Sequence, residues 1–197
     1  MENPGDDLKA IREMMEKSSK FLSLSGLSGI MAGVTAIAGA AFAYHYLLTS
    51  VDADKAQKIT VLLIDAILVL ISSLAFAIYF SWEKAKKNKL NFYNKVLIKT
   101  LYNLSIPLAA GGILCTAMLF RGQTDFIAAT TLIFYGLALV NASKYTFEEI
   151  HYLGITEIIL GLCAAIFISN GLIIWTIGFG FCHVIYGFIM YKKYDKI

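Results

Sequence analysis

Charged residues are scarce in this chain of 197 residues. They make up 16% of the sequence, whereas hydrophobic residues make up 58%. Soluble domains contain about 25% charged residues, so a chain this apolar has too little polar surface to cover a soluble fold. The scarcity of charge therefore argues against an ordinary soluble domain. The basic residues form no long run with interleaved aromatic residues, so we expect no nucleic-acid partner.

Cysteine is also scarce. Cys115, Cys163 and Cys182 all lie within apolar runs, and their odd number and spacing fit neither a zinc motif nor a CxxC pair. We interpret them as small core residues. No HExxH motif occurs, and the last apolar run has no lysine near its middle. The sequence therefore predicts no metal site and no cofactor.

The chain contains several long apolar runs. A transmembrane helix needs about 20 mostly apolar residues. The run from Ile150 to Tyr191 is about twice this length and contains Glu157 as its only formal charge, so we divide it at the turn signal Ser169-Asn170-Gly171. The runs are too long and too uniform for the alternating strands of a barrel. The predicted spans are residues 21–48, 59–82, 96–120, 124–144, 149–169 and 171–191.

The expected fold class is an all-α polytopic membrane protein, because a helix satisfies its own backbone hydrogen bonds in hydrocarbon. Residues 21–197 would form a bundle of six transmembrane helices in the lipid bilayer. Gly26, Gly29 and Gly33 in the first span have the same spacing as Gly154, Glu157 and Gly161 in the fifth. Such a repeat indicates three helical hairpins of one kind.

Lysine and arginine are distributed unevenly between the two sides of the predicted bundle. The side that holds both termini carries 14 of the 17 basic residues, and the opposite side has only Lys55, Lys58 and Arg121. Short cytoplasmic loops are enriched in lysine and arginine. We therefore expect both termini to lie in the cytoplasm.

Residues 1–20 precede the first span and show a helical periodicity. Leu8, Ile11 and Met15 recur at helical spacing, while Lys9 and Arg12 lie largely elsewhere on the helix. We interpret this segment as an amphipathic helix that lies on the inner leaflet. The alternative is a docking site for a cytoplasmic protein partner.

The fifth and sixth spans carry a pattern of glycine and aliphatic residues. Tyr152-Leu153-Gly154-Ile155 is followed by Ile159-Leu160-Gly161-Leu162, and then by a turn and a helix with Tyr186-Gly187. Over residues 130–191 this hairpin resembles small bacterial six-helix inner-membrane proteins of the HdeD acid-resistance type. The resemblance implies a bacterial inner-membrane protein linked to stress, and it transfers no catalytic residue to this chain.

Small residues follow one face of several predicted helices. They let helices approach closely and gain dispersion contacts that lipid does not provide. We interpret them as packing positions within the bundle, and a homo-oligomer interface is the alternative. The positions are Gly26, Gly29, Gly33, Gly154, Gly161, Gly180 and Gly187.

Polar side chains at membrane depth are the main functional signal, because an ionised group there costs roughly 2.5–3.5 kcal/mol. Asp65 lies toward the outer side, where it would extend a polar path outward. Pro107 lacks a backbone N–H and is a candidate hinge. The residues predicted to share one polar pocket, open to the cytoplasm, are Glu157, His183, Asn103 and Asn141.

Two functions remain open at this point. The first is a small ion or solute transporter, or a channel, that uses Glu157 as a protonatable group. The alternative is a non-transport stress-response or regulatory component, which would bind a partner through the N-terminal helix and the Lys84–Lys95 loop. An enzyme that acts on lipid ranks last, because no serine in the first span has a convincing base. Glu157 itself has a purely structural interpretation, as an acid that ties two helices together.

Overall fold

The computed structural model describes residues 23–196, and the regular structure in this range is helical throughout. The main helices are α2 (Gly26–Thr49), α3 (Lys55–Lys87), α4 (Lys95–Phe120), α5 (Ile127–Ala142), α6 (Glu148–Ile166), α7 (Gly171–Trp175) and α8 (His183–Met190). Short 3-10 or π-helical segments connect or extend them: η1 (Ser143–Tyr145), η2 (Ile168–Asn170), η3 (Thr176–Cys182) and η4 (Tyr191–Asp195).

The described residues contain six helices that are long and apolar enough to cross a membrane. This agrees with the number of spans predicted from the apolar runs. The last of them runs from Ile168 to Asp195 and is built from η2, α7, η3, α8 and η4; we call it the C-terminal helix. The predicted amphipathic helix at residues 1–20 lies outside the described residues.

Side-chain caps define where the first three helices begin. Ser25 precedes α2 and accepts a hydrogen bond from the Leu27 N–H, Asp54 caps α3 through the Gln57 N–H, and Asn94 caps α4 in the same way. Such oxygens satisfy backbone donors that have no partner inside the helix. The first helix therefore starts at Gly26 rather than at residue 21, where the apolar run begins.

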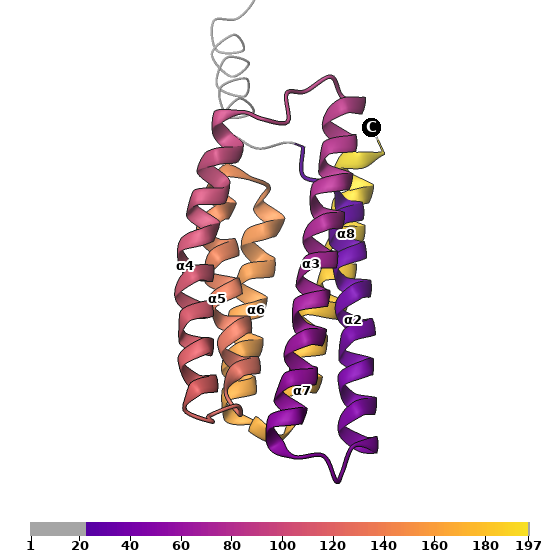
Figure 1. Cartoon of the computed structure of the whole chain (residues 1–197). Helices are drawn as coiled ribbons and strands as arrows, with labels where there is room; N and C mark the ends of the chain where they lie inside the picture. The colour runs from indigo at the N-terminus through magenta and orange to yellow at the C-terminus, as the bar shows by residue number, and fades with distance from the viewer. Residues whose placement is uncertain (1–22, 197) are drawn as a thin grey trace, which may run out of the picture.

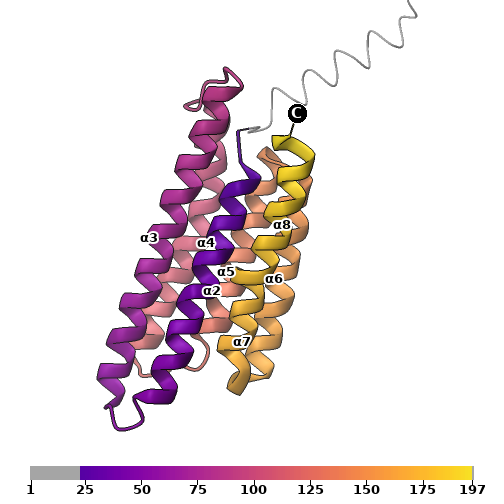
Figure 2. The same cartoon turned by 90° about the vertical axis from the view of Figure 1, so that its right-hand side faces the viewer.

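The C-terminal helix lies between two groups of helices. It packs on α2 on one side and on α6 on the other, while α3 packs mainly on α2 and α4 mainly on α5. Figure 1 shows α4, α5 and α6 together on one side of the molecule, and Figure 2 shows α2 between α3 and α8. The outermost helices, α3 and α4, have few buried residues, so most of their apolar surface is available to lipid.

Glycines form the closest helix contacts on both sides of the bundle. A Cβ atom at Gly187 would lie 2.7 Å from the Gly26 carbonyl oxygen, and one at Gly33 would lie 2.6 Å from the Gly180 carbonyl oxygen. Gly154 in α6 faces Gly136 in α5, where an added Cβ would lie 2.8 Å from the carbonyl oxygen.

The remaining glycines of the predicted packing stripes also lie where two helix backbones approach closely. A Cβ at Gly29 would lie 3.0 Å from the Gly187 Cα, and one at Gly161 would lie 2.9 Å from the Ile133 backbone nitrogen. The structure therefore places the glycine stripes in contacts within one chain, where backbones approach without intervening side chains.

An ion-pair cluster joins both ends of the chain to α3. Lys84 Nζ lies 2.7 Å from Asp195 Oδ1 and donates a hydrogen bond of 2.8 Å to the Leu24 carbonyl oxygen. The other oxygen of Asp195 accepts hydrogen bonds of 2.9 Å from the Ser25 hydroxyl and the Gly26 N–H. A carboxylate at this position also stabilises the positive end of the α2 dipole.

The position of Lys84 corrects one sequence prediction. The sequence assigned Lys84 to a basic loop that is available to a partner, but its side chain is 8% exposed and is paired with Asp195. The exposed basic positions of this stretch begin at Lys86. The correction has a physical reason: α3 continues as a helix to Lys87, and this carries Lys84 onto the face that packs against α2.

We predict that Lys84→Met lowers the stability of the bundle. The substitution leaves Asp195 buried without its cation, and breaking a buried pair from one side costs about 3 kcal/mol or more. The measurement is thermal unfolding in detergent. Lys87→Met is the matched control, because Lys87 is exposed near the end of the same helix. Equal melting temperatures for the two variants would contradict the prediction.

Candidate functional site

Glu157 is the most deeply buried acidic group among the described residues, with 0% of its surface exposed. It lies on α6, about 14 Å along the helix from Glu148 at 1.5 Å per residue. This depth is close to the middle of a hydrocarbon core about 30 Å thick. Intramembrane acids of this kind usually mark functional positions.

His183 approaches Glu157 from the C-terminal helix. Its Nδ1 atom lies 3.3 Å from Glu157 Oε1 and 3.0 Å from the Gly178 carbonyl oxygen, while its Nε2 atom lies 2.9 Å from the Tyr135 hydroxyl. A carbonyl oxygen can only accept, so Nδ1 carries a proton. In a neutral imidazole Nε2 then accepts a hydrogen bond from the Tyr135 hydroxyl. Gly178 and Tyr135 together therefore select the tautomer.

The π-helical segment η3 shapes the wall opposite Glu157. A Cβ atom at Gly178 would lie 2.5 Å from Glu157 Oε2 and 2.6 Å from the Leu132 Cδ2 atom, so a larger residue there would require the Glu157 and Leu132 side chains to shift. Trp175 at the end of α7 and Phe179 in η3 have ring centroids 4.8 Å apart, and Phe179 stacks on His183. Single π-helical turns are frequent at functional sites.

Glu157 lacks hydrogen-bond partners, and this limits the protonation states that the site can adopt. Neither of its carboxyl oxygens has a hydrogen-bond partner in the described part of the chain, and an isolated buried carboxylate is strongly disfavoured. One solution is a proton on Glu157 beside a neutral His183. The other is an ionised Glu157 beside an imidazolium at 3.3 Å. Both arrangements carry the same net charge.

The proton cannot pass directly from Glu157 to the nearest nitrogen of His183. That nitrogen is Nδ1, which already carries a proton directed at Gly178. A proton therefore reaches or leaves His183 at Nε2, on the side of the Tyr135 hydroxyl. The geometry places Glu157 and His183 side by side, and it makes the Tyr135 hydroxyl the group that contacts Nε2 of His183.

Asn103 and Asn141 form a separate pair in the structure. The Asn141 side-chain amide donates a hydrogen bond of 2.9 Å to the Asn103 backbone carbonyl oxygen. That carbonyl is the one deprived of its helical partner by Pro107, four residues later in α4, because proline has no N–H. Helix α4 runs through Pro107 without ending, and Asn141 replaces the missing donor.

These contacts divide the four residues that the sequence placed in one pocket. Glu157 and His183 face each other between α6 and the C-terminal helix, whereas Asn103 and Asn141 meet between α4 and α5. The sequence indicates how deep each residue lies along its helix, and these depths are similar. It does not define which faces of the helices contact one another. Glu157 itself has no exposed surface.

Asp65 lies apart from both groups. It is on α3 and faces α2, where a Cβ atom at Gly39 would lie 3.4 and 3.5 Å from its two carboxyl oxygens. Helix α2 stands between α3 and α8 (Figure 2). Asp65 therefore belongs to a different helix interface from Glu157.

Sequence reasoning missed two residues of this site, Tyr135 and Gly178. The sequence patterns pointed to neither Tyr135 nor Gly178. The available signal was a tyrosine within one apolar span, together with an acid and a histidine in two other spans. We call Glu157, His183, Tyr135 and Gly178 the Glu157 centre. Among the described residues, no three histidine, cysteine or acidic side chains form a group that could hold a metal ion.

No protein-family model, curated protein or solved structure matches this chain. The class of protein therefore rests on the structure alone. Six helices of membrane-spanning length and composition define an integral membrane protein.

We predict that Asn141→Leu destabilises the protein only while Pro107 is present. Leucine leaves the Asn103 carbonyl without a donor, and interhelical hydrogen bonds in membranes contribute about 0.6–1.7 kcal/mol. Pro107→Ala restores the backbone N–H, so the same substitution should cost little in that background. Thermal unfolding of the two single variants and the double variant measures the coupling. Additive effects would show that Asn141 does not compensate for Pro107.

We also predict that Tyr135→Phe destabilises the protein by about 1–3 kcal/mol, because it leaves the Nε2 atom of His183 buried without a partner. Tyr186→Phe is the matched control. Tyr186 packs against the same apolar cluster as Tyr135, but its buried hydroxyl has no hydrogen-bond partner in the region described. Its removal should leave the melting temperature in detergent unchanged or raised. A similar loss in both variants would mean that the Tyr135–His183 bond contributes little.

Proposed function

We propose that this chain is a small membrane transporter for an ion or solute, and that the Glu157 centre is its proton-binding group. The observation that carries the proposal is a carboxyl group at mid-membrane depth that is completely buried, has no hydrogen-bond partner among the described residues, and lies 3.3 Å from a histidine. A purely structural acid would be expected to hold its neighbours through hydrogen bonds.

The burial of Glu157 favours a transporter over an open channel. A channel needs a continuous hydrated path, whereas Glu157 has no exposed surface. Access to the carboxyl group then requires helices to move, which is the basis of alternating access in transporters. The C-terminal helix is the candidate element for such movement, because its π-helical segment lies beside Glu157.

The two protonation arrangements of the centre give the proposed transport cycle its chemical basis. With His183 neutral, Glu157 keeps its proton and the centre is uncharged. When Nε2 of His183 takes up a proton on the Tyr135 side, Glu157 can release its own proton to water once helix movement exposes it, and it then remains paired with the imidazolium. The centre thus takes a proton on one side and releases one on the other without a net buried charge.

The proposed orientation has both termini in the cytoplasm of a bacterial cell. The excess of lysine and arginine on that side supports the orientation, and the resemblance to the HdeD type supports the inner membrane. A non-transport regulatory component remains the competing function.

We predict that Glu157→Gln abolishes proton-coupled flux in proteoliposomes. Glutamine has nearly the same shape as glutamate but cannot ionise, so the flux should fall at least about tenfold, as expected for loss of an essential proton carrier. The measurement records an internal pH-sensitive dye under imposed proton, sodium and potassium gradients. Asp125→Asn is the matched control, since it removes one carboxylate from an exposed loop.

Thermal unfolding in detergent separates a lost function from a lost fold. The proposal requires Glu157→Gln to keep the wild-type melting temperature while it loses flux. Normal flux together with reduced stability would make Glu157 a structural acid. Absence of flux in the wild-type protein would favour the regulatory component instead.

A further inference from the structure

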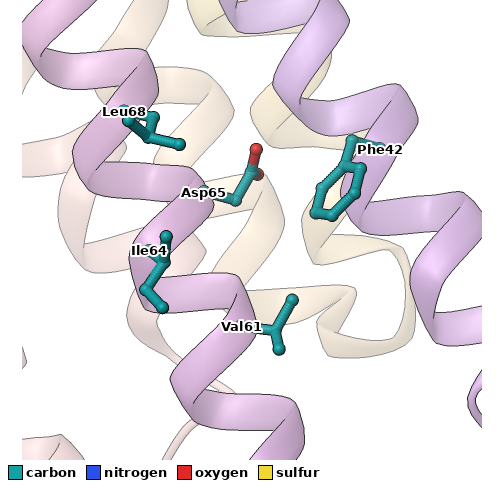
Figure 3. Close-up of a pocket in the computed structure, with 5 residues that line it drawn as sticks. All are labelled: Phe42, Val61, Ile64, Asp65 and Leu68. Carbon is teal, nitrogen blue, oxygen red and sulfur yellow. The ribbon is translucent and has the colours of Figure 1, made fainter.

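A small apolar pocket lies between α2 and α3, on the opposite side of α2 from the Glu157 centre. Its volume is about 220 Å³, and it is lined by Phe42, Val61, Ile64, Asp65 and Leu68. Figure 3 shows the Asp65 carboxyl group directed from α3 toward α2, with the Phe42 ring facing it across the gap. Asp65 is the only charged residue of the lining.

The Asp65 carboxyl group makes no hydrogen bond or ion pair with any residue that the structure describes. Other polar groups of the same interface are satisfied, since the hydroxyls of Thr35 and Ser73 lie 3.1 Å apart across α2 and α3. Gly39 lies beside the carboxyl group, since a Cβ atom there would be 3.4 and 3.5 Å from its two oxygens, and the missing side chain leaves room for Val69 of α3.

The depth of Asp65 makes this isolation costly. The residue lies about 15 Å along α3 from Lys55 at 1.5 Å per residue, well inside a helix that has no buried residue in its most apolar window. An ionised side chain in the hydrocarbon region is disfavoured unless it is paired. A cation that enters the pocket would remove this cost, because it supplies the missing charge.

The pocket also determines which cations can enter. Phe42, Ile64 and Leu68 are 49%, 53% and 58% exposed, so the pocket opens sideways toward lipid. A strongly hydrated metal ion would lose its water there without gaining enough oxygen ligands. An organic cation with alkyl groups loses little hydration, and the Phe42 ring offers it a cation–π contact.

We propose that the α2–α3 pocket binds lipophilic organic cations of the quaternary ammonium class, with Asp65 as the counter-ion and Phe42 as the aromatic wall. Pockets for drug-sized ligands occupy about 300–1,000 Å³, so a volume of about 220 Å³ suits a trimethylammonium head with a short alkyl chain. The inference does not depend on the proposed proton site, because Glu157 belongs to another helix interface.

The test is equilibrium binding of hexyltrimethylammonium to the full-length protein in uncharged maltoside micelles, with binding to empty micelles subtracted. Asp65→Asn should weaken binding at least about tenfold, as expected when one partner of a desolvated charge pair is removed. Phe42→Leu keeps the apolar wall but removes the ring, and should weaken binding about threefold. Asp65→Asn should not lower the melting temperature, because the carboxyl group has no hydrogen-bond or ion-pair partner among the described residues.

Two substitutions of other acids serve as controls. Asp52→Asn removes one carboxylate from the exposed loop before α3, and Glu157→Gln neutralises the other intramembrane acid. Both should bind the probe as the wild type does. Loss of binding in Glu157→Gln with normal binding in Asp65→Asn would place the cation in the Glu157 centre and overturn the proposal.

The contribution of the probe's charge to binding is measured by comparison with its uncharged isostere, 2,2-dimethyloctane. If the hydrocarbon binds as tightly as the ammonium ion, or if Asp65→Asn leaves the affinity unchanged, the probe only partitions onto apolar surface and the proposal is wrong. Weak binding of the hydrocarbon, together with the loss in Asp65→Asn, supports it. This result would stand whether or not the protein moves protons through Glu157.

Discussion

The contact between the Glu157 carboxyl group and Gly178 fixes the position of the C-terminal helix. Because Gly178 has no side chain, the helix can approach α6 closely enough for the carboxyl group to occupy the place of a Cβ atom. That approach brings His183 to 3.3 Å from Glu157 and allows Tyr135 to reach the far side of the imidazole. The protonation state of one buried acid is thereby linked to the packing of a whole helix.

The same helix is held on its other side by backbone contacts with α2. Gly180 and Gly187 leave so little space that added Cβ atoms would meet Ile37 or the backbone of α2. A tightly packed interface has discrete arrangements and does not deform continuously. A change of charge at Glu157 therefore has a direct mechanical consequence, because the C-terminal helix cannot shift on α6 without also shifting on α2.

The sequence predicted the six helices because the apolar runs are long and nearly free of charge. Its failures all concern which faces of the helices meet. Asn141 compensates for Pro107 across α4 and α5, and Lys84 reaches Asp195 more than one hundred residues away. Hydrophobicity along the chain does not encode these pairings. The π-helical segment was equally hidden, since its glycines and aromatic residues match an ordinary apolar span.

The two intramembrane acids differ in how accessible their carboxyl groups are, and this difference determines which ions can reach each of them. Glu157 is enclosed by α5, α6 and the C-terminal helix with no exposed surface and no hydrogen-bond partner among the described residues, so a change of its charge requires these helices to move. Asp65 borders a pocket that opens toward lipid, so an ion dissolved in the membrane can reach it without any helix movement. Helix α2 packs on both α3 and the C-terminal helix. It therefore stands between the two acids and keeps the Asp65 pocket apart from the Glu157 centre.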